Sequence, residues 1–165
     1  MPPKRDLKRQ ALSQISLGVK YESGQPCWCA DNSPEAYLKG TVAEDGGGKT
    51  IQVQVGGSKV AAFERSDVYQ VNPKAQDGAA DNTELMYLRE PHMLHNLRCR
   101  FLRDAVYTYT AHILVACNPF KPLSIYEVAD MKRYSGKPFG VLAPHVFAIA
   151  ERAYRSLLKP SGSQP

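Results

Sequence analysis

The change of residue pattern at Asn72–Ala80 is the feature that most restricts how this chain of 165 residues can fold. This segment, NPKAQDGAA, combines Asn, Pro, Gly, Asp and alanines without any period, which is typical of a linker. Before it, apolar and polar residues alternate in short runs between glycine turns, whereas after it apolar residues recur at helical spacing. The two patterns predict two structural parts, the first built from strands and the second from strands mixed with helices.

The part before the linker is predicted to be a small β-barrel. Closely spaced short strands separated by glycine turns favour such a barrel, and Trp28 is the expected core anchor. A module of this length buries little core alone, so docking on a larger body would stabilise it. The expected strands are Tyr37–Val42, Ile51–Val55, Lys59–Phe63 and Val68–Val71, and the expected turns are Glu44–Gly48 and Gly56–Ser58.

The glycine-rich stretch AEDGGGKTIQVQV, residues 43–55, has some ingredients of a phosphate-binding loop. Such a loop reads G-x-x-x-x-G-K-[ST] and opens a helix, whose free N–H groups hold the phosphate. Ala43 stands where the first glycine belongs, and the residues after Thr50 alternate as in a strand. The stretch is therefore predicted to be a hairpin turn and not a nucleotide site.

The part after the linker is predicted to be mixed α/β. Asp81 and Glu84 are spaced as a capping box for a short helix, and Pro91 suits the first turn of the next. The run over 113–117 is almost wholly apolar, so this strand is expected to be buried in a sheet. The further elements expected are a helix with the apolar stripe Leu94, Leu97 and Phe101, a strand over 106–110, a helix through Val128, Met131 and Tyr134 capped by Gly136, and a helix opened by Pro144 through Phe147, Ala150, Tyr154 and Leu157.

His92, His95 and Cys99 have a spacing that suits a metal site. They follow one another at i, i+3 and i+7, so one helical face presents two imidazoles and a thiol, which are zinc ligands. A fourth ligand has no obvious source, and Leu94 and Leu97 already explain a helix that packs by its other face. We therefore predict no metal in this chain.

The other cysteines and histidines suggest no chemistry. Cys27-Trp28-Cys29 is too tight for a common zinc knuckle and has no matching pair elsewhere. His112 and His145 are isolated and are expected to be structural. No Ser/His/Asp or Cys/His set can be assembled, so no catalytic residues are predicted.

The segment ACNPFKPLSIY, residues 116–126, is the strongest candidate for binding. An apolar strand runs into Asn118-Pro119, where proline ends the ladder, and ligands of α/β folds collect at the carboxyl ends of strands. An amide (Asn118), a cation (Lys121) and a phenol (Tyr126) on one loop could hold a flat heterocycle. The alternative is an ordinary Asn-Pro turn.

Charge, hydropathy and cysteine content indicate the cellular compartment in which the protein is expected. The chain has no run of 18 apolar residues and no apolar N-terminal segment, which argues against a membrane span and a signal peptide. Four cysteines without a paired framework indicate reduced thiols and a cytoplasmic protein. The first ten residues carry part of the net charge of +5, since Lys4, Arg5, Lys8 and Arg9 outnumber Asp6, but no aromatic residues interleave with these charges. We expect a solvated, flexible lead-in over 1–25 and no nucleic-acid binding.

Several stretches, in this order, closely resemble the start of a myosin motor domain. They are TELMYLREPHMLHNLRCRF (83–101), VYTYT (106–110), CNPFKPLSIY (117–126) and PHVFAIAERAY (144–154). Trp28, YLKG (37–40) and DVYQVNP (67–73) look like the SH3-like N-terminal subdomain of myosin heavy chains. The resemblance covers about residues 27–165, with the SH3-like subdomain over 26–73 and the start of the P-loop NTPase-type motor domain over 74–165.

The resemblance implies a part of an actin-based, ATP-driven cytoskeletal motor. In the family, the N-P-x6-Y loop lines the purine side of the ATP pocket. Its positions are matched here by Asn118, Pro119, Phe120, Lys121 and Tyr126, with Tyr126 expected against the adenine and Lys121 near the nucleotide. The implied cofactor is ATP, with Mg²⁺ in the complete motor. The implied partners are actin filaments and the remainder of the heavy chain.

Two departures from the family pattern limit what the resemblance implies. Residues 137–143, KPFGVLA, lack the charged residues usual there, which would alter a surface loop near the nucleotide. The P-loop, the switch loops and the Mg²⁺ ligands of the family are not found in these 165 residues. Phosphoryl transfer depends on such groups, so we expect no ATP hydrolysis by this chain alone, and its status as an enzyme stays open. The alternative function is a stand-alone SH3-like interaction module with a degenerate motor remnant.

Overall fold

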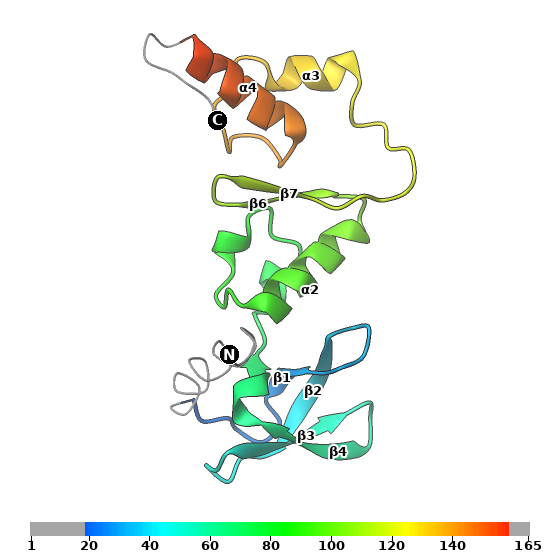
Figure 1. Ribbon diagram of the computed structural model, residues 1–165, viewed down its shortest axis with the longest axis vertical. Coiled ribbons are helices and arrows are strands. Elements are labelled where there is room, and N and C mark those ends of the chain that lie inside the picture. The colour runs from blue at the N-terminus through cyan, green and yellow to red at the C-terminus, as the bar shows by residue number, and fades with distance from the viewer. Residues whose placement is uncertain (1–18, 159–165) are drawn as a thin grey trace, which may run out of the picture. The chain divides into compact units, whose positions relative to one another are not determined.

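A computed structural model describes residues 19–158, which form two compact units divided between Val71 and Asn72 (Figure 1). Most of the predicted lead-in, residues 1–18, and residues 159–165 lie outside the described part. Within 19–158, no helix is both long and apolar enough to cross a bilayer.

The first unit is a five-stranded antiparallel sheet with the strand order β4-β3-β2-β1-β5. The strands are β1 (Pro26–Ala30), β2 (Tyr37–Glu44), β3 (Thr50–Val55), β4 (Lys59–Glu64) and β5 (Val68–Gln70), with a 3₁₀ turn η1 (Arg65–Asp67) before β5. All four strands expected from the alternation are confirmed, and β1 is added to them. Since β1 pairs with both β2 and β5, the last strand returns beside the first.

Period-two alternation sets which side chains enter the core of this unit. In β3, Ile51 and Val53 are fully buried, while their neighbours along the strand face outward. In β1 the buried positions are Cys27 and Cys29, so Trp28 between them points to the other face. The expectation that Trp28 anchors the core is wrong, because three alternating residues do not reveal which face is buried. Trp28 instead lies under the Lys39 ammonium, 5.8 Å from the ring centroid to Nζ.

Residues 19–25 also differ from the expectation of a flexible lead-in. Tyr21 is buried in the core of the sheet, and its hydroxyl donates to the Val68 carbonyl at 2.8 Å. The Gly24 N–H donates to the Val42 carbonyl, and the Val42 N–H donates to the Gln25 carbonyl. Backbone hydrogen bonds and a buried phenol therefore hold this segment against β2 and β5.

The glycine-rich stretch is the hairpin turn between β2 and β3, as predicted. The Asp45 carboxylate accepts the Gly47 N–H at 2.9 Å, and the Arg65 Nε–H donates to the Gly48 carbonyl at 2.9 Å. Asp45 and Arg65 also form a buried ion pair. A carboxylate already occupies the N–H side of this turn and a strand follows it, so the turn offers no phosphate cradle.

The second unit mixes helices with one β-hairpin. Its elements are η2 (Lys74–Gln76), η3 (Asn82–Glu84), α2 (Glu90–Phe101), β6 (Tyr107–Thr110), β7 (Ile113–Ala116), α3 (Val128–Tyr134) and α4 (Val146–Leu157). The hairpin β6–β7 lies between α2 on one side and the α3–α4 pair on the other (Figure 1). The mixed α/β class is confirmed, and Pro91 lies in the first turn of α2 as expected.

The buried face of α2 is not the apolar stripe expected from the sequence. Leu94 and Phe101 are 45% and 40% exposed, whereas Asn96 is almost fully buried. The Asn96 amide accepts the Gly78 N–H at 2.9 Å and donates to the Ala79 carbonyl at 3.0 Å. Because unpaired backbone groups are costly to bury, the helix turns its hydrogen-bonding face toward the segment before it.

Strand β7 is also less buried than predicted. It pairs only with β6 among the described residues, and Ile113 is 67% exposed. The apolar run therefore predicts the strand correctly, but it does not predict that the strand is exposed in a two-stranded sheet. Instead, the apolar contacts of this unit gather around Tyr109, Tyr134 and Ala148.

Candidate functional site

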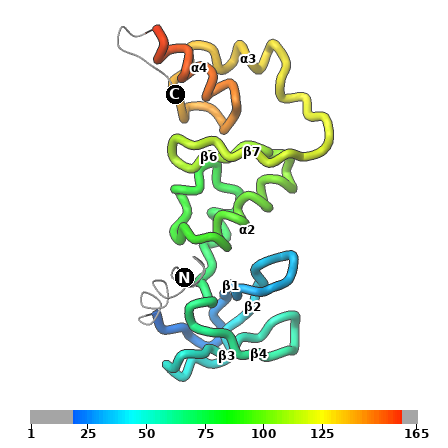
Figure 2. The backbone as a smooth tube through the Cα atoms, in the orientation of Figure 1, coloured from blue at the N-terminus to red at the C-terminus, as the bar shows by residue number. Residues whose placement is uncertain are grey.

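The loop between β7 and α3, residues 117–127, carries all the predicted site residues and makes a long excursion between the two elements (Figure 2). The Cys117 N–H still donates to the Val106 carbonyl at 2.9 Å, so pairing with β6 ends only at Asn118. The Asn118 side chain accepts the Phe120 N–H at 2.9 Å. This turn places Phe120 at φ 52°, with its ring 91% exposed. Half-buried Pro119 lies at the bend, as expected for a strand terminator.

Lys121 forms an exposed ion pair. Its ammonium is 2.6 Å from an Asp104 carboxylate oxygen, and both side chains are half-exposed. Such pairs contribute about 0–1 kcal/mol, so the ammonium can exchange Asp104 for another anion at little cost.

Tyr126 contacts an aromatic cluster on the hairpin and α4. Its hydroxyl lies 2.9 Å from the hydroxyl of Tyr107 on β6, and its ring centroid is 5.7 Å from that of His145. The ring of Tyr126 is nonetheless 52% exposed. Tyr126 therefore combines a fixed hydroxyl with an open aromatic surface.

His145 is the centre of this cluster. It is 6% exposed, and its ring centroid lies 4.7 to 5.1 Å from those of Phe147, Tyr107 and Tyr134. Its Nδ1 accepts the Phe147 N–H at 3.1 Å and so caps the N-terminus of α4. An accepting Nδ1 requires the neutral tautomer with its hydrogen on Nε2. Consistently, burial lowers the pKa of His145.

A cavity of about 210 Å³ adjoins the cluster. Its lining includes Arg100, Asp104, Tyr107, Asp130, Arg133 and His145. Pockets for drug-sized ligands have about 300–1,000 Å³, so this cavity has room for only part of such a molecule. None of the five residues predicted from the sequence lines it, although Ile125 of the same loop does.

The structure thus does not bring the predicted residues to one point. Asn118 bonds within its own loop, Lys121 pairs with Asp104, and Tyr126 bonds to Tyr107. The sequence did not predict that Tyr107 contacts Tyr126, since its only signal was a position in an expected strand. It also predicted a structural His145 but not the position of that ring at the centre of the aromatic cluster.

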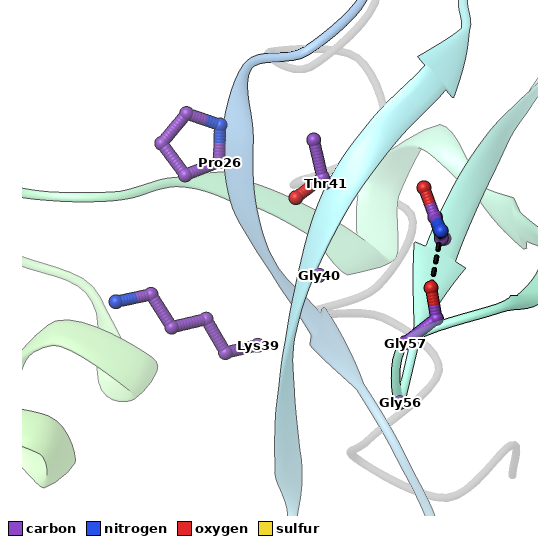
Figure 3. Close-up of a pocket in the computed structure, with 7 residues that line it drawn as sticks. Pro26, Lys39, Gly40, Thr41, Gly56 and Gly57 are labelled. Carbon is purple, nitrogen blue, oxygen red and sulfur yellow. Dashed lines mark hydrogen bonds between the residues drawn. The ribbon is translucent and has the colours of Figure 1, made fainter.

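Two further hollows lie elsewhere. One of about 400 Å³ in the first unit is lined by Pro26, Lys39, Gly40, Thr41, Gln54, Gly56 and Gly57 (Figure 3). Its Gln54 side chain donates to the Gly57 carbonyl, which closes the turn between β3 and β4. The other, of about 490 Å³, lies between α3 and α4 and includes Met131, Tyr134, Phe147 and Tyr154. Neither contains a residue predicted for binding.

The histidines and the cysteine of α2 do not form the set expected from their spacing. His92 is buried and caps its helix, because its Nδ1 accepts the Arg89 N–H at 3.2 Å. His95 instead lies 3.1 Å from Asp77 and 3.5 Å from the Cys99 sulfur. Asp77 of the linker, and not His92, therefore lies beside His95 and Cys99.

In the segment over residues 137–143, whose one charged residue is Lys137, the Phe139 ring contacts side chains of β6 and α4. Phe139 lies 4.6 Å from Tyr109 between ring centroids, and the Arg152 guanidinium lies 5.1 Å from the Phe139 centroid. An aromatic contact and a cation–π contact thus hold the segment on β6 and α4.

Comparison with known proteins identifies the family. The myosin head (motor domain) family matches residues 79–165, and the chain belongs to this family. It is 37% identical to myosin-9 of Arabidopsis thaliana over 158 residues, or 94% of this chain and 10% of that protein. It is 40% identical to myosin-11 of the same plant over 142 residues (85% and 9%). It is 38% identical to unconventional myosin-VI of Bos taurus over 140 residues (82% and 11%). The chain spans about a tenth of the length of these relatives.

Proposed function

We propose that this chain is part of an ATP-driven, actin-based motor, and that its loop Asn118–Tyr126 forms the purine side of the ATP pocket. Membership of the myosin head family supports the motor assignment. The observation that carries the assignment of the loop is the Tyr126 ring, which is half-exposed while its hydroxyl is held at 2.9 Å by Tyr107. A phenol fixed at one end presents a flat surface whose ordering on binding costs little entropy.

The neighbouring residues fit the same ligand. A purine can stack on Tyr126 or on the exposed ring of Phe120, and the bend at Asn118-Pro119 holds Phe120 outward. The Lys121 ammonium, paired with a half-exposed Asp104, can move toward a phosphate chain. In this assignment Asn118 and Pro119 shape the loop, whereas the rings and the cation contact ATP.

The groups for hydrolysis come from elsewhere in the motor. The one Gly-Lys-Thr in these 165 residues, Gly48–Thr50, lies in a β-hairpin whose turn is bound to Asp45 and Arg65. We propose that a P-loop and Mg²⁺ ligands outside this sequence complete the pocket, and that the chain alone does not hydrolyse ATP. Actin and the remaining heavy chain are then its partners, in the cytoskeleton of the cytoplasm.

We further propose that residues 26–73 form the SH3-like subdomain of a myosin and residues 74–165 the start of its motor domain. The pairing of β1 with both β2 and β5 around one buried core supports a small barrel. A stand-alone interaction module is not favoured, since the family match covers residues 79–165, beyond the barrel.

Photolabelling tests the purine assignment. The full chain is irradiated with 2-azido-ATP, and the labelled peptides are identified by mass spectrometry, with excess ATP as competitor. We expect labelling within residues 118–126 that ATP suppresses and that Tyr126→Ala abolishes. Tyr154→Ala, which removes another exposed tyrosine from α4, is the matched control and should label normally. Labelling elsewhere, or none, contradicts the assignment.

Phosphate release tests the second part of the proposal. The chain is incubated with ATP, Mg²⁺ and actin filaments, and phosphate is measured against a blank without the chain. We expect no release above the blank. Turnover above it would show that these residues already contain a complete phosphoryl-transfer site.

A further inference from the structure

The structure brings Asp77, His95 and Cys99 together in the second unit. His95 and Cys99 lie one turn apart on α2, and Asp77 follows η2 in the linker. The Asp77 Oδ1 is 3.1 Å and the Cys99 Sγ is 3.5 Å from the same His95 atom, Nε2. All three ligand atoms lie within 4.8 Å of one another, and all three residues are half-buried.

The shared contact on Nε2 distinguishes this cluster from a proton relay. In a nucleophile–histidine–carboxylate relay the two partners use different ring nitrogens, so that a proton can pass through the imidazole. Here both partners meet one nitrogen, which carries either a single hydrogen or a single lone pair. Two ligand atoms within 3.5 Å of one imidazole nitrogen, and all three within 4.8 Å of one another, are close enough together to surround a metal ion.

The spacing also fits a tetrahedral ion. Zinc bonds of about 2.0–2.3 Å imply ligand–ligand separations of about 3.3–3.8 Å. The sulfur–nitrogen distance of 3.5 Å falls in this range, and the oxygen–nitrogen distance of 3.1 Å needs only a small adjustment. We propose that Asp77, His95 and Cys99 bind a zinc ion, with water in the fourth position.

The chemistry of the donors selects the metal. A thiolate with an imidazole and a carboxylate suits Zn²⁺, whereas Mg²⁺ and Ca²⁺ prefer oxygen ligands alone. A thiolate, a carboxylate and a neutral imidazole around Zn²⁺ also give zero net charge. The nearby Arg103 guanidinium, which donates to the Asp77 carbonyl at 3.4 Å, therefore faces no excess positive charge when the ion is bound.

The surroundings hold the linker against the helix before any ion binds. Asn96 accepts the Gly78 N–H at 2.9 Å, and the Arg100 guanidinium donates to the Gly78 carbonyl at 3.0 Å. The Asp77 N–H donates to the Lys74 carbonyl at 3.1 Å. Both backbone groups of the residue after Asp77 are thus fixed to α2, which lowers the entropy that a bridging ion must overcome.

Metal titration tests this site directly. The full chain, reduced and metal-free, competes for Zn²⁺ with a chromophoric chelator, and Co²⁺ is then used as a spectroscopic probe. We expect one ion per chain and a thiolate-to-Co²⁺ charge-transfer band. Cys99→Ser should remove the band, and His95→Gln and Asp77→Asn should each weaken Zn²⁺ binding about tenfold or more.

Matched controls separate this site from the other thiols and imidazoles. Cys117→Ser and His112→Gln replace residues of the same unit outside the cluster and should leave the affinity unchanged. A charge-transfer band that persists in Cys99→Ser would place the thiolate at another cysteine and overturn the proposal. So would the absence of Zn²⁺ binding by the unsubstituted chain.

Thermal unfolding gives an independent measurement. An ion that joins the linker to α2 stabilises the folded state by mass action, so Zn²⁺ should raise the Tm of the chain. At the same Zn²⁺ concentration this rise should be clearly smaller in Asp77→Asn, which alters only one carboxyl oxygen and keeps the side-chain size. An equal rise in Asp77→Asn would contradict the proposed ligand set, whatever the folding of the other variants.

Discussion

The hydroxyls of Tyr107 and Tyr126 lie 2.9 Å apart and join the loop after β7 to the first strand of the hairpin. Burial of Tyr107 and this contact with the Tyr126 hydroxyl raise the pKa of Tyr107 to about 12. The pair therefore connects a half-exposed candidate binding residue to strand β6 of the second unit. The strength of this hydrogen bond between the two hydroxyls can be measured without any ligand.

Replacement of Tyr126 by Phe should lower the pKa of Tyr107 partway toward its ordinary value of about 10. Burial remains in this variant, so the shift should not disappear completely. Spectrophotometric titration of tyrosinate, compared with the same titration of Tyr107→Phe, isolates this residue. Tyr154→Phe serves as the control, and an unchanged Tyr107 titration in Tyr126→Phe would show that the hydroxyl contact is not formed in solution.

The same shift predicts a loss of stability at high pH. Tyr107 has a higher pKa in the folded than in the unfolded state, so its contribution is complete below about pH 10 and is lost as pH rises toward 12. The free energy of unfolding should fall less steeply over this interval in Tyr107→Phe. Urea unfolding at several pH values measures both slopes, and equal slopes would contradict the assignment.

The Asp45–Arg65 pair should dominate the acid sensitivity of the first unit. Both side chains are almost fully buried. The hydrogen bonds from Arg65 hold the pKa of Asp45 well below its usual range, against the effect of burial. A lowered folded-state pKa means that the contribution is present above the unfolded value of about 3.9 and is lost as pH falls below it. Asp45→Asn should cost about 3–5 kcal/mol at neutral pH, because it leaves a buried guanidinium uncompensated.

Glu64→Gln is the matched control for this substitution. It removes an acid next to Arg65 in sequence but exposed in the structure, and it should change the free energy of unfolding by less than about 0.5 kcal/mol. Chemical unfolding of both variants at neutral pH and below pH 4 decides the comparison. If Asp45→Asn retained the acid sensitivity of the unsubstituted chain, another carboxyl group would be responsible for it.

The sequence predicts element types better than it predicts which faces are buried. Alternation in Ile51–Val55 and the proline at the start of α2 are local signals, and both elements form as expected. The buried face of α2 depends on Asn96, whose partners Gly78 and Ala79 lie in the linker. A hydrophobic stripe contains no information on where backbone groups of another segment need hydrogen bonds. For this reason the apolar stripe wrongly predicts that Leu94 is buried.

In the candidate site, too, local features can be predicted from the sequence, whereas contacts between distant segments cannot. Asn118-Pro119 and Tyr126 stand out in the sequence because they combine a turn with an aromatic residue. The partner of Tyr126 lies on β6, nineteen positions earlier in the chain, and the partner of His95 lies in the linker. Neither contact follows from spacing, since each joins two segments whose approach is set by the tertiary fold.

Gly40 in β2 should not tolerate a side chain. A Cβ there would lie 2.6 Å from a methyl carbon of Val53 and 2.9 Å from the Gln54 carbonyl oxygen on β3. Gly40→Ala should therefore cost about 1–3 kcal/mol through overpacking. Gly46→Ala is the control, because a Cβ at Gly46 meets nothing within 4 Å. Thermal unfolding of the two variants should differ clearly, and equal Tm values would mean that β2 and β3 separate at little cost.

His145 should make the stability of the second unit depend on pH near neutrality. Burial lowers its pKa, although the Ile125 backbone and the Asp130 carboxylate oppose the shift. A histidine with a lowered folded-state pKa binds fewer protons when folded, so its contribution is complete above the unfolded value of about 6.5. As pH falls below 6.5, the unfolded state takes up protons first and the free energy of unfolding decreases. Protonation would also end the cap, because Nδ1 then carries a hydrogen.

His145→Asn separates titration from capping, since asparagine is a good N-cap but does not titrate. This variant should lose stability from the missing ring, yet its free energy of unfolding should change less between pH 7 and pH 5 than that of the unsubstituted chain. His112→Asn, which removes an exposed imidazole, should keep the original pH dependence. Urea titrations across this interval give the slopes, and a His145→Asn slope equal to that of the unsubstituted chain would assign the proton uptake to a different group.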